Sequence, residues 1–302
     1  MGPSLRFCMV TTFYPPYSFG GDGMFVYRFS NLLAERGHSV DVIHCRDAYY
    51  AQHATEPVGE WPNHPRITLH SLKSKAGILS PLLTQQLGIP GLKAGKIKRI
   101  LTEGRFDVIH YHNVSLVGGP KVLEYGCAIK LYTTHEYWLL CPTHVLFKFN
   151  QEACTKPSCL MCQLSCRKPP QLWRYTGIMD RALRQLDAVI SPSQFAADAH
   201  RHMGLNVEKT VIPMFVPSRQ AEQERGEFLP ASLPDGQLPY FLYVGRLEKL
   251  KGLQEVIPFF AQQDQADLLV AGTGQYESEL KRLAQDSPRV TFLGALPFER
   301  LR

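Results

Sequence analysis

Long apolar runs, internal repeats and low-complexity tracts are all missing from this sequence of 302 residues. No run reaches the roughly eighteen apolar residues that a membrane-spanning helix needs. The beginning of the chain lacks the pattern of a secretory signal peptide, so we expect a cytoplasmic protein whose thiols stay reduced. Hydrophobic residues make up 44% of the chain and charged residues 20%. That balance is typical of a globular protein with a core, and the length allows two domains.

A dinucleotide-binding fingerprint is missing as well. The spacing G-x-G-x-x-G does not occur near the first expected helix, where only Gly21 and Gly23 stand two positions apart,. This disfavours a nicotinamide-dependent oxidoreductase. Gly20 and Gly21 nevertheless follow the first expected strand and precede a helix that starts at Asp22. In an open α/β sheet, ligands approach the backbone closely at this place.

Strand-like runs alternate with amphipathic segments along most of the chain, which indicates parallel α/β sheets. Strands are expected at residues 6–11, 39–45, 67–72, 106–112, 130–134, 187–191 and 210–213, and then at 240–244, 267–271 and 290–293. Helices are expected from Asp22 to Gly37 and at residues 171–186, 194–203, 253–260 and 275–284, with a loop at 46–65.

The composition divides this α/β chain into two domains. Residues 1–213 form the first domain, with a cysteine-rich insertion at 141–170, and residues 239–302 form the second. The polar, non-periodic residues 214–238 are the predicted linker. Three expected strands make a poor free-standing parallel sheet, so we expect the second domain to be incomplete.

Several histidines follow expected strands of the first domain. His110 and His112 close one strand, and His135-Glu136 follows the next. Because parallel strands end at the same edge of a sheet, these residues should line one face together with Gly20-Gly21. His135 precedes Tyr137 and Trp138, a polar and aromatic cluster that suits a sugar, so we expect His135 to contact substrate. For His110 and His112 we favour a structural role that satisfies nearby polar groups.

The second domain opens with a strand, a glycine turn and two cations. Gly245-Arg246 follows the strand, and Lys251-Gly252 precedes the amphipathic helix. The first backbone N–H groups of a helix are unpaired and favour anions. Arg246 offers a planar fork and Lys251 a point charge, so the pair could hold a diphosphate without a metal. The alternative is an ordinary solvated turn.

Two further segments stand out by composition. Cations and leucines are mixed in residues 73–100, which is typical of a peripheral contact with an anionic membrane, although a solvated helix face over a core is the alternative. Five of the eight cysteines are crowded into the insertion, which favours a candidate structural zinc site or unliganded thiols over disulfides. An iron-sulfur cluster is a less favoured alternative. These five are Cys141, Cys154, Cys159, Cys162 and Cys166. Cys8, Cys45 and Cys127 are expected in the core.

Motifs in a fixed order along the chain are Gly20-Gly21, residues 34–40, 106–112, 134–136 and 187–193, Gly245-Arg246 with Lys251-Gly252, and Gly272-Thr273-Gly274. In this order they resemble glycosyltransferase family 4. The resemblance implies two Rossmann-like domains facing a cleft, the GT-B fold. It implies a retaining, metal-independent enzyme that moves a sugar from a nucleotide-sugar donor to a glycan or lipid-linked acceptor. Cell-envelope polysaccharide or glycolipid synthesis is the expected setting.

The resemblance also assigns residues. Arg246, Lys251, Gly20 and Gly21 would bind the donor diphosphate, and His135 would be the catalytic residue at the transferred sugar. Gly245, Gly274 and Glu136 would add further substrate contacts.

The family's E-x-x-x-x-x-x-x-E signature is missing from residues 239–302 and should lie beyond Arg302. We therefore expect a C-terminally truncated chain that is inactive alone. A noncatalytic remnant that binds nucleotide or glycan is the alternative function. A nucleic-acid-binding protein is least favoured, because the cations that follow the cysteines are spread along one helix without a recognition pattern.

Overall fold

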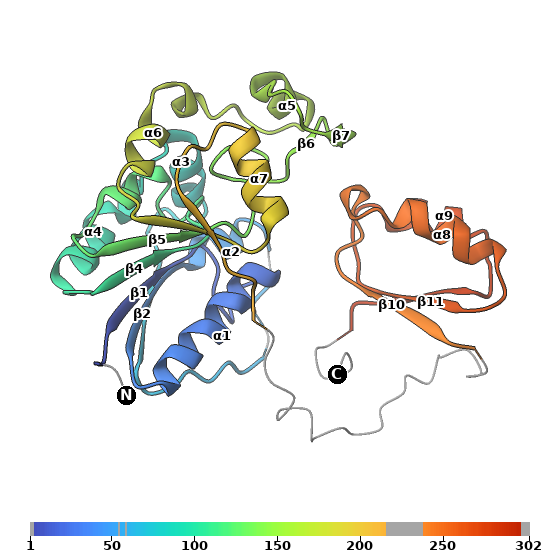
Figure 1. Cartoon of the computed structure of the whole chain (residues 1–302), viewed down its shortest axis with the longest axis horizontal. Coiled ribbons are helices and arrows are strands. Elements are labelled where there is room, and N and C mark those ends of the chain that lie inside the picture. The colour runs from blue at the N-terminus through green and yellow to red at the C-terminus, as the bar shows by residue number, and fades with distance from the viewer. Residues whose placement is uncertain (1–2, 54, 58, 216–237, 297–302) are drawn as a thin grey trace. The chain divides into compact units, whose positions relative to one another are not determined.

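The computed structural model describes residues 3–53, 55–57, 59–215 and 238–296. The chain divides into two compact units, which are each described by themselves (Figure 1). Unit 1 comprises Met1–Phe149 and Ala153–Met214, and unit 2 comprises Phe215–Arg302 together with Asn150–Glu152. Most of the predicted linker at 214–238 lies outside the described residues.

Unit 1 is built on a seven-stranded, wholly parallel sheet in the order β3-β2-β1-β4-β5-β8-β9. The strands are β1 (Arg6–Val10), β2 (Ser39–Cys45), β3 (Ile67–Leu72), β4 (Val108–Tyr111), β5 (Ile129–Thr133), β8 (Ala188–Ser191) and β9 (Lys209–Val211). The chain first builds the sheet outward from β1 to β3 and then returns to the other side of β1. The boundary between β1 and β4 is therefore a topological switch point, where ligands of open α/β sheets bind.

Both faces of this sheet are covered. Successive side chains of a strand point to opposite faces. Cys8 and Val10 of β1 accordingly belong to one buried cluster, whereas Met9 belongs to another that also contains Val26 of α1. The covering helices of unit 1 are α1 (Gly21–Glu35), α2 (Arg46–Tyr50), α3 (Leu79–Leu87), α4 (Ala94–Glu103), α6 (Ile178–Leu183) and α7 (Gln194–His202), with short 3-10 helices η1 (Gly91–Lys93), η2 (Pro120–Glu124) and η3 (Leu172–Tyr175).

Three expectations for unit 1 are wrong in detail. Residues 46–65 contain α2 in place of a continuous loop. The helix expected over 171–186 is two short pieces, η3 and α6, because Gly177 between them adopts a left-handed conformation with φ of 72°. Cys127 is exposed, so it is not a core residue.

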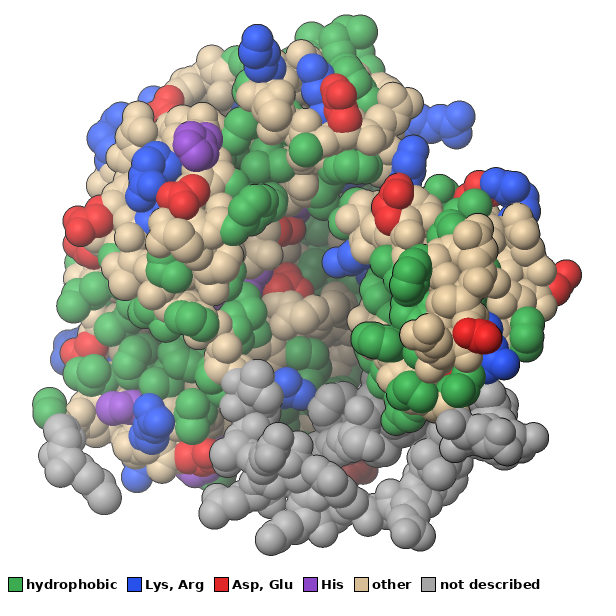
Figure 2. Space-filling view, turned by 45° about the vertical axis from the view of Figure 1, so that its right-hand side comes forward, with side chains coloured by type: hydrophobic (Ala, Val, Ile, Leu, Met, Phe, Trp, Pro, Cys, Tyr) green, Lys and Arg blue, Asp and Glu red, His purple; other side chains and the backbone are tan. Residues whose placement is uncertain are grey.

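Unit 2 has a smaller parallel sheet in the order β10-β11-β12. Its elements are β10 (Tyr240–Val244), η5 (Lys249–Lys251), α8 (Leu253–Gln262), β11 (Asp267–Ala271), α9 (Glu277–Ala284) and β12 (Val290–Gly294). All five residues of β11 are buried, whereas four of the five in β10 are exposed. Figure 2 shows exposed hydrophobic side chains in green on the surface that faces the viewer.

The cysteine-rich insertion forms a small substructure of its own. A two-stranded sheet pairs β6 (Phe147–Lys148) with β7 (Glu152–Ala153), and the helix α5 (Cys159–Ser165) follows. Figure 1 shows this insertion as a projection that stands apart from the seven-stranded sheet.

Candidate functional site

Three histidines form a column at the carboxyl ends of β4 and β5. His112 Nδ1 and His135 Nε2 are 2.9 Å apart and share a hydrogen bond. His110 lies within β4, where its ring stacks on that of His112 with centroids 4.3 Å apart, and its Nε2 is 2.7 Å from the hydroxyl of Thr133. The strand ends therefore bring together the three histidines that the sequence singles out.

Aromatic side chains of α1 wall this column. Phe25 lies with its ring centroid 5.2 Å from that of His135, and Phe29 lies 5.8 Å from that of His110. The two phenylalanines are four residues apart, so both occupy the same face of α1. They withdraw the imidazoles from water.

This burial decides the charge of the histidines. It lowers the pKa of His110 to about 3 and that of His135 to about 4, and it holds the pKa of His112 well below its ordinary value. The neighbouring imidazoles lower the pKa of His110 and His112 further, because positive charges so close together repel,. All three rings are neutral at pH 7, and each offers one donor and one acceptor.

Some polar atoms around the column are buried and have no hydrogen-bond partner among the described residues. They are Nδ1 of His135, Nε2 of His112 and Oε1 of Glu136. The other carboxylate oxygen of Glu136, Oε2, is 2.7 Å from Nδ1 of His144. Buried polar atoms are nearly always paired, so these unpaired atoms retain hydrogen-bonding capacity that a polar ligand or a water molecule would satisfy.

The glycine pair lies at the same edge of the sheet. Gly20 has φ of 102°, which only glycine adopts without strain, and a Cβ on Gly21 would meet no atom within 4 Å,. Asn113, after β4, donates from Nδ2 to Asp22 in the first turn of α1 across 3.3 Å. That bond ties the glycine turn to the strand that carries the histidines. A hollow of about 120 Å³ lies against Gly20.

In unit 2, two glycine loops pack tightly at the carboxyl ends of β10 and β11. The N–H of Leu247 donates to the carbonyl of Thr273 at 2.9 Å, and the N–H of Tyr276 donates to the carbonyl of Leu247 at 3.0 Å. A Cβ on Gly274 would lie 2.2 Å from the Leu247 oxygen, and one on Gly272 would lie 1.8 Å from the Gly245 oxygen. Only glycine permits this contact.

Both predicted cations face solvent, Arg246 within the first loop of this paired-loop platform and Lys251 in η5, which follows it. The Arg246 side chain is 70% exposed and forms an ion pair of 2.5 Å with Glu248, while Lys251 is exposed in η5. The hydroxyl of Tyr243 donates to the carbonyl of Arg246 at 3.0 Å and holds the turn in place. Lys251 thus stays hydrated, whereas Arg246 is exposed to solvent but paired with Glu248.

The cysteines of the insertion also converge. Cys141, Cys154, Cys159 and Cys162 line one small hollow, while Cys166 at the end of α5 lies beside Cys162. Within the described residues, no three His, Cys, Asp or Glu side chains form a ready-made metal site.

Sequence reasoning missed Asp22, Asn113 and His144. Asp22 directly follows the glycine pair at a helix start, which was a signal. Asn113 and His144 gave none, because only the fold brings Asn113 to α1 and His144 to Glu136. Burial raises the pKa of Asp22, and the negative charge of Glu136 adds to this effect.

Comparison with known proteins identifies two family matches. The model of Glycosyltransferase Family 4 matches residues 19–220, and that of Glycosyl transferases group 1 matches residues 224–302. An uncharacterized 42.6 kDa protein in the cps region of Klebsiella pneumoniae is 24% identical over 306 residues, which cover 98% of this chain and 75% of that protein. Alpha-monoglucosyldiacylglycerol synthase of Streptococcus pneumoniae is 33% identical over 117 residues, 34% of this chain and 26% of that enzyme.

Solved structures share the fold. HepE from Anabaena, in complex with UDP and glucose, matches with a TM-score of 0.52 at 17% identity, over 98% of this chain and 71% of that one. A glycosyltransferase from Rickettsia africae matches with a TM-score of 0.52 at 12% identity, over 99% of this chain and 70% of that one. Both are GT-B glycosyltransferases. Since the first family model spans more than half of the chain, the chain belongs to glycosyltransferase family 4 and has the GT-B fold.

Proposed function

We propose that this protein transfers a sugar from a nucleotide-sugar donor to a glycan or lipid-linked acceptor, with retention of configuration, in the synthesis of cell-envelope polysaccharide or glycolipid. The observation that carries the proposal is the pairing of two kinds of site within one family 4 chain. Unit 1 offers a neutral histidine column with unpaired polar atoms, and unit 2 offers exposed cations beside the paired-loop platform.

The unit 2 platform suits the diphosphate. Departure of a nucleoside diphosphate builds negative charge on its oxygens, and fixed cations stabilise that charge. Arg246 and Lys251 would supply the charge, and the loops at Gly245 and Gly274 would let the diphosphate approach the backbone. Glu248 would release Arg246, because a diphosphate is the stronger partner for its guanidinium.

The histidine column suits the sugar. With a pKa of about 4, His135 is neutral at pH 7 and would act through a hydrogen bond at Nδ1, without carrying charge. Its Nε2 is held by His112, so the ring has a fixed orientation. Oε1 of Glu136, the backbone of Gly20-Gly21 and the open face at the switch point would contribute the remaining contacts.

Relatives support the acceptor class. One relative is a protein of a cps region, another is an alpha-monoglucosyldiacylglycerol synthase, and the HepE structure holds UDP and glucose. A nucleoside diphosphate of the UDP type and a glycan or lipid acceptor are therefore the first probes.

The test combines binding with transfer. Calorimetric titration of the full chain with UDP, GDP and ADP should show saturable binding of one nucleoside diphosphate. The matching nucleotide sugars are then supplied with lipid and glycan acceptors, and the anomeric configuration of any product is read by NMR. If the chain binds a nucleotide but transfers no sugar, the noncatalytic nucleotide-binding alternative is favoured over the enzyme. If the chain binds no nucleoside diphosphate, the proposed donor site is wrong.

We further propose that unit 1 rests on an anionic membrane surface. In the part of the chain that the structure describes, no helix is both long and apolar enough to cross a bilayer. Around α3, the apolar side chains Leu79, Leu83 and Leu87 are 59%, 45% and 49% exposed. Lys96 and Lys98 of α4 are exposed nearby in sequence. Exposed leucines with neighbouring cations match the chemistry of an anionic lipid interface.

Vesicle sedimentation tests this surface. The full chain should sediment with vesicles of phosphatidylglycerol and phosphatidylcholine, and much less with phosphatidylcholine alone. The variant Leu79→Ser/Leu83→Ser should remain in the supernatant, whereas the exposed unit 2 variant Lys281→Ser should sediment as the unchanged chain does. Equal sedimentation of all variants would overturn the proposal.

A further inference from the structure

The cysteine-rich insertion has no hydrophobic core. Between residues 144 and 170, only Cys162 and Gln163 are buried. Its larger apolar side chains point outward, since Leu160, Met161 and Leu164 are 43%, 62% and 53% exposed. A segment of this size with so little apolar burial needs a covalent or metal crosslink to hold one conformation.

The backbone of the insertion is also strained. Several residues other than glycine have positive φ around the hairpin: His144 at 75°, Leu146 at 48°, Phe149 at 56° and Asn150 at 57°. Each such residue costs on the order of 1 kcal/mol. An interaction that the apolar contacts do not supply must offset this cost.

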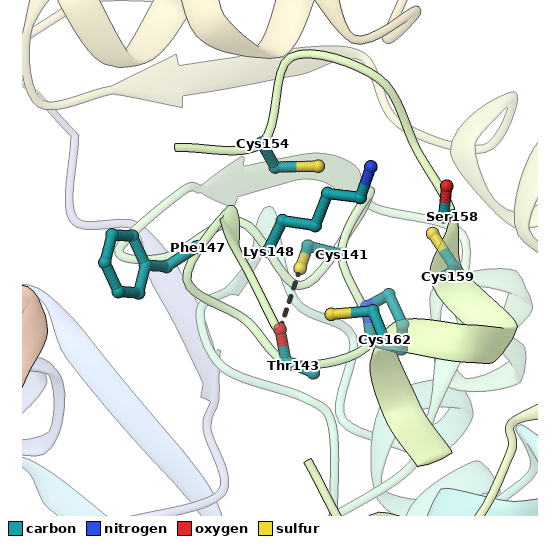
Figure 3. Close-up of a pocket in the computed structure, with 9 residues that line it drawn as sticks. Cys141, Thr143, Phe147, Lys148, Cys154, Ser158, Cys159 and Cys162 are labelled. Carbon is teal, nitrogen blue, oxygen red and sulfur yellow. Dashed lines mark hydrogen bonds between the residues drawn. The ribbon is translucent and has the colours of Figure 1, made fainter. Parts of the chain in front are cut away.

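Thiols from separate parts of the insertion come together and could supply this stabilising interaction. Cys141 lies six residues after His135, Cys154 follows β7, and Cys159 and Cys162 lie three residues apart on one face of α5. All four line the same hollow of about 20 Å³, and Figure 3 shows them standing around it. A hollow of this size has room for a single ion,.

Cations and an N–H donor lie around the thiols. Arg174 is held by hydrogen bonds to Gln171 and to the carbonyl of Trp138, both 2.8 Å, and its charge acts on Cys141 and Cys159. The backbone N–H of Phe149 donates to Sγ of Cys162 across 3.3 Å. Lys148 lines the hollow as well. Cations and N–H donors of this kind stabilise the net negative charge of a tetrathiolate metal site.

We propose that Cys141, Cys154, Cys159 and Cys162 bind one structural Zn²⁺ ion. Four sulfur ligands and no exchangeable position are the pattern of a closed tetrahedral zinc site. Each thiol loses its proton to solvent as the metal binds, so binding strengthens as pH rises. Because the described side chains do not form a ready-made metal site, zinc draws the thiols inward and orders the hairpin as it binds. Cys166 lies outside the ligand set.

The zinc also supports the sugar site. Cys141 is only six residues after His135, and its N–H donates to the carbonyl of Tyr137 at 2.7 Å. His144, three residues later, accepts a bond from the N–H of Tyr137 at 2.9 Å and holds Oε2 of Glu136 at 2.7 Å. A metal that fixes residues 141–144 therefore fixes the carboxylate of Glu136. This support rests on the proposed function, whereas zinc binding itself does not.

Metal content of the full chain tests the site first. The freshly purified protein should contain about one zinc ion per chain by mass spectrometry of the metal, as a closed site requires. After chelation, Co²⁺ alone should give the intense visible bands of a tetrahedral cobalt thiolate. Absence of stoichiometric zinc together with absence of that spectrum would overturn the proposal. Iron with inorganic sulfide, or disulfides among these cysteines, would overturn it as well.

Single substitutions define the ligands. Each of Cys154→Ser, Cys159→Ser and Cys162→Ser should lower zinc content at least tenfold. Cys166→Ser, which changes the neighbouring thiol of the same insertion, and Cys127→Ser, which changes an exposed thiol elsewhere, should keep the zinc. Loss of zinc in Cys166→Ser, or its retention in Cys159→Ser and Cys162→Ser, would show this ligand set to be wrong.

Hydrogen exchange separates loss of metal from loss of fold. When zinc is chelated from the unsubstituted chain, amide protection should fall in residues 144–168 and remain in β1 and β4. Protection that is unchanged in the insertion would contradict a structural role. Amide protection in the insertion should return when zinc is added back to the unsubstituted chain. This measurement needs no serine variant, so it is valid even where such a variant fails to fold.

Discussion

The two units carry opposite chemistry. All eleven histidines and all three tryptophans of the chain lie in unit 1, whereas unit 2 has neither. The candidate site of unit 1 is made of buried imidazoles that are neutral at pH 7, and that of unit 2 is made of exposed cations. Unit 1 thus offers orientation through hydrogen bonds, and unit 2 offers charge. A sugar needs the first and a diphosphate needs the second.

The units also differ in packing. In unit 1 the central strand β4 is buried along its whole length and helices cover both sheet faces. In unit 2 the helices α8 and α9 cover β11, while Tyr240, Phe241, Leu242 and Val244 of β10 remain exposed within the described residues. The same kind of parallel strand therefore meets two different environments, and four experiments follow from the contrast.

Acid should destabilise unit 1 most strongly. Burial lowers the pKa of His44, His110, His112, His135 and His200. A lowered pKa means that the unfolded state binds the proton more readily. Stability is therefore complete above about pH 6.5 and falls as pH drops toward the folded pKa of about 4,. At pH 5 a histidine whose folded pKa is about 4, such as His44 or His135, removes about 2 kcal/mol from the free energy of unfolding,.

Tryptophan fluorescence reads this effect, because only unit 1 contains tryptophan. The urea midpoint should fall clearly between pH 7.5 and pH 5.0. Burial raises the pKa of Asp22 and Asp47, which opposes the effect and leaves a smaller net loss. His110→Asn should reduce the pH dependence of the urea midpoint by the contribution of about one histidine. His202→Gln, which changes an exposed histidine, should leave that pH dependence unchanged. Equal midpoints at both pH values would contradict the neutral histidine column.

Removing the unit 2 cations should weaken binding of a nucleoside diphosphate next most strongly. A hydrogen bond to a charged group contributes about 1.5 to 3 kcal/mol, so Arg246→Ala and Lys251→Ala should each lower UDP affinity by about tenfold or more. Arg246→Lys should fall between, because it keeps the charge and loses the fork. Calorimetry with UDP measures all three.

The matched control is Arg282→Ala, which removes an exposed arginine of α9 that pairs with Glu279. UDP affinity should be unchanged in this variant. If Arg282→Ala weakened binding as much as Arg246→Ala, the effect would reflect the total charge of unit 2, and the platform would lose its special role.

The fold class could be predicted from the sequence because buried parallel strands appear as short continuous runs of apolar residues. Runs such as Val108-Ile109-His110-Tyr111 and Leu268-Leu269-Val270 are buried on both sides and read as strands without further help. The crossover rule predicted that the parallel strands end at one edge of the sheet, whereas the order of the strands is known from the structure alone,. The helix break at Gly177 was less visible, since one left-handed glycine ends a helix that its neighbours would continue.

The site was predictable where it depends on strand ends and hidden where it depends on packing. His135 and Gly20-Gly21 follow strands, so their meeting was expected. The ion pair of Arg246 with Glu248 and the neutral state of His112 arise from side-chain geometry and from burial, which no local pattern records. Tertiary contact alone brings Asn113 to Asp22, across 91 residues.

His135 should affect sugar recognition while sparing the diphosphate. His135→Ala removes the open Nδ1 atom, and one neutral hydrogen bond contributes about 1 kcal/mol,. The affinity for the best-binding UDP sugar should fall about fivefold, with UDP affinity unchanged. His135→Gln should recover part of the loss. Equal losses for UDP and its sugar would show that the residue acts through the fold, which the urea midpoint of the same variant would confirm.

The smallest effect is expected on the exposed face of β10. Tyr240 is 56% exposed, so Tyr240→Thr, which introduces a β-branched side chain that suits a strand, should change the free energy of unfolding of unit 2 by less than about 0.5 kcal/mol,. Leu268→Ala on the neighbouring β11 removes a side chain that is 3% exposed and should cost about 2 to 5 kcal/mol,.

Hydrogen exchange of the β11 amides measures both variants, since unit 2 has no tryptophan to report its unfolding. A parallel sheet is normally covered on both faces, so the contrast between β10 and β11 is the unusual feature of this unit. If Tyr240→Thr cost as much as Leu268→Ala, then the side chains of β10 are packed in solution. The side chains of β10 would then be covered, and the difference in packing between the two units would disappear.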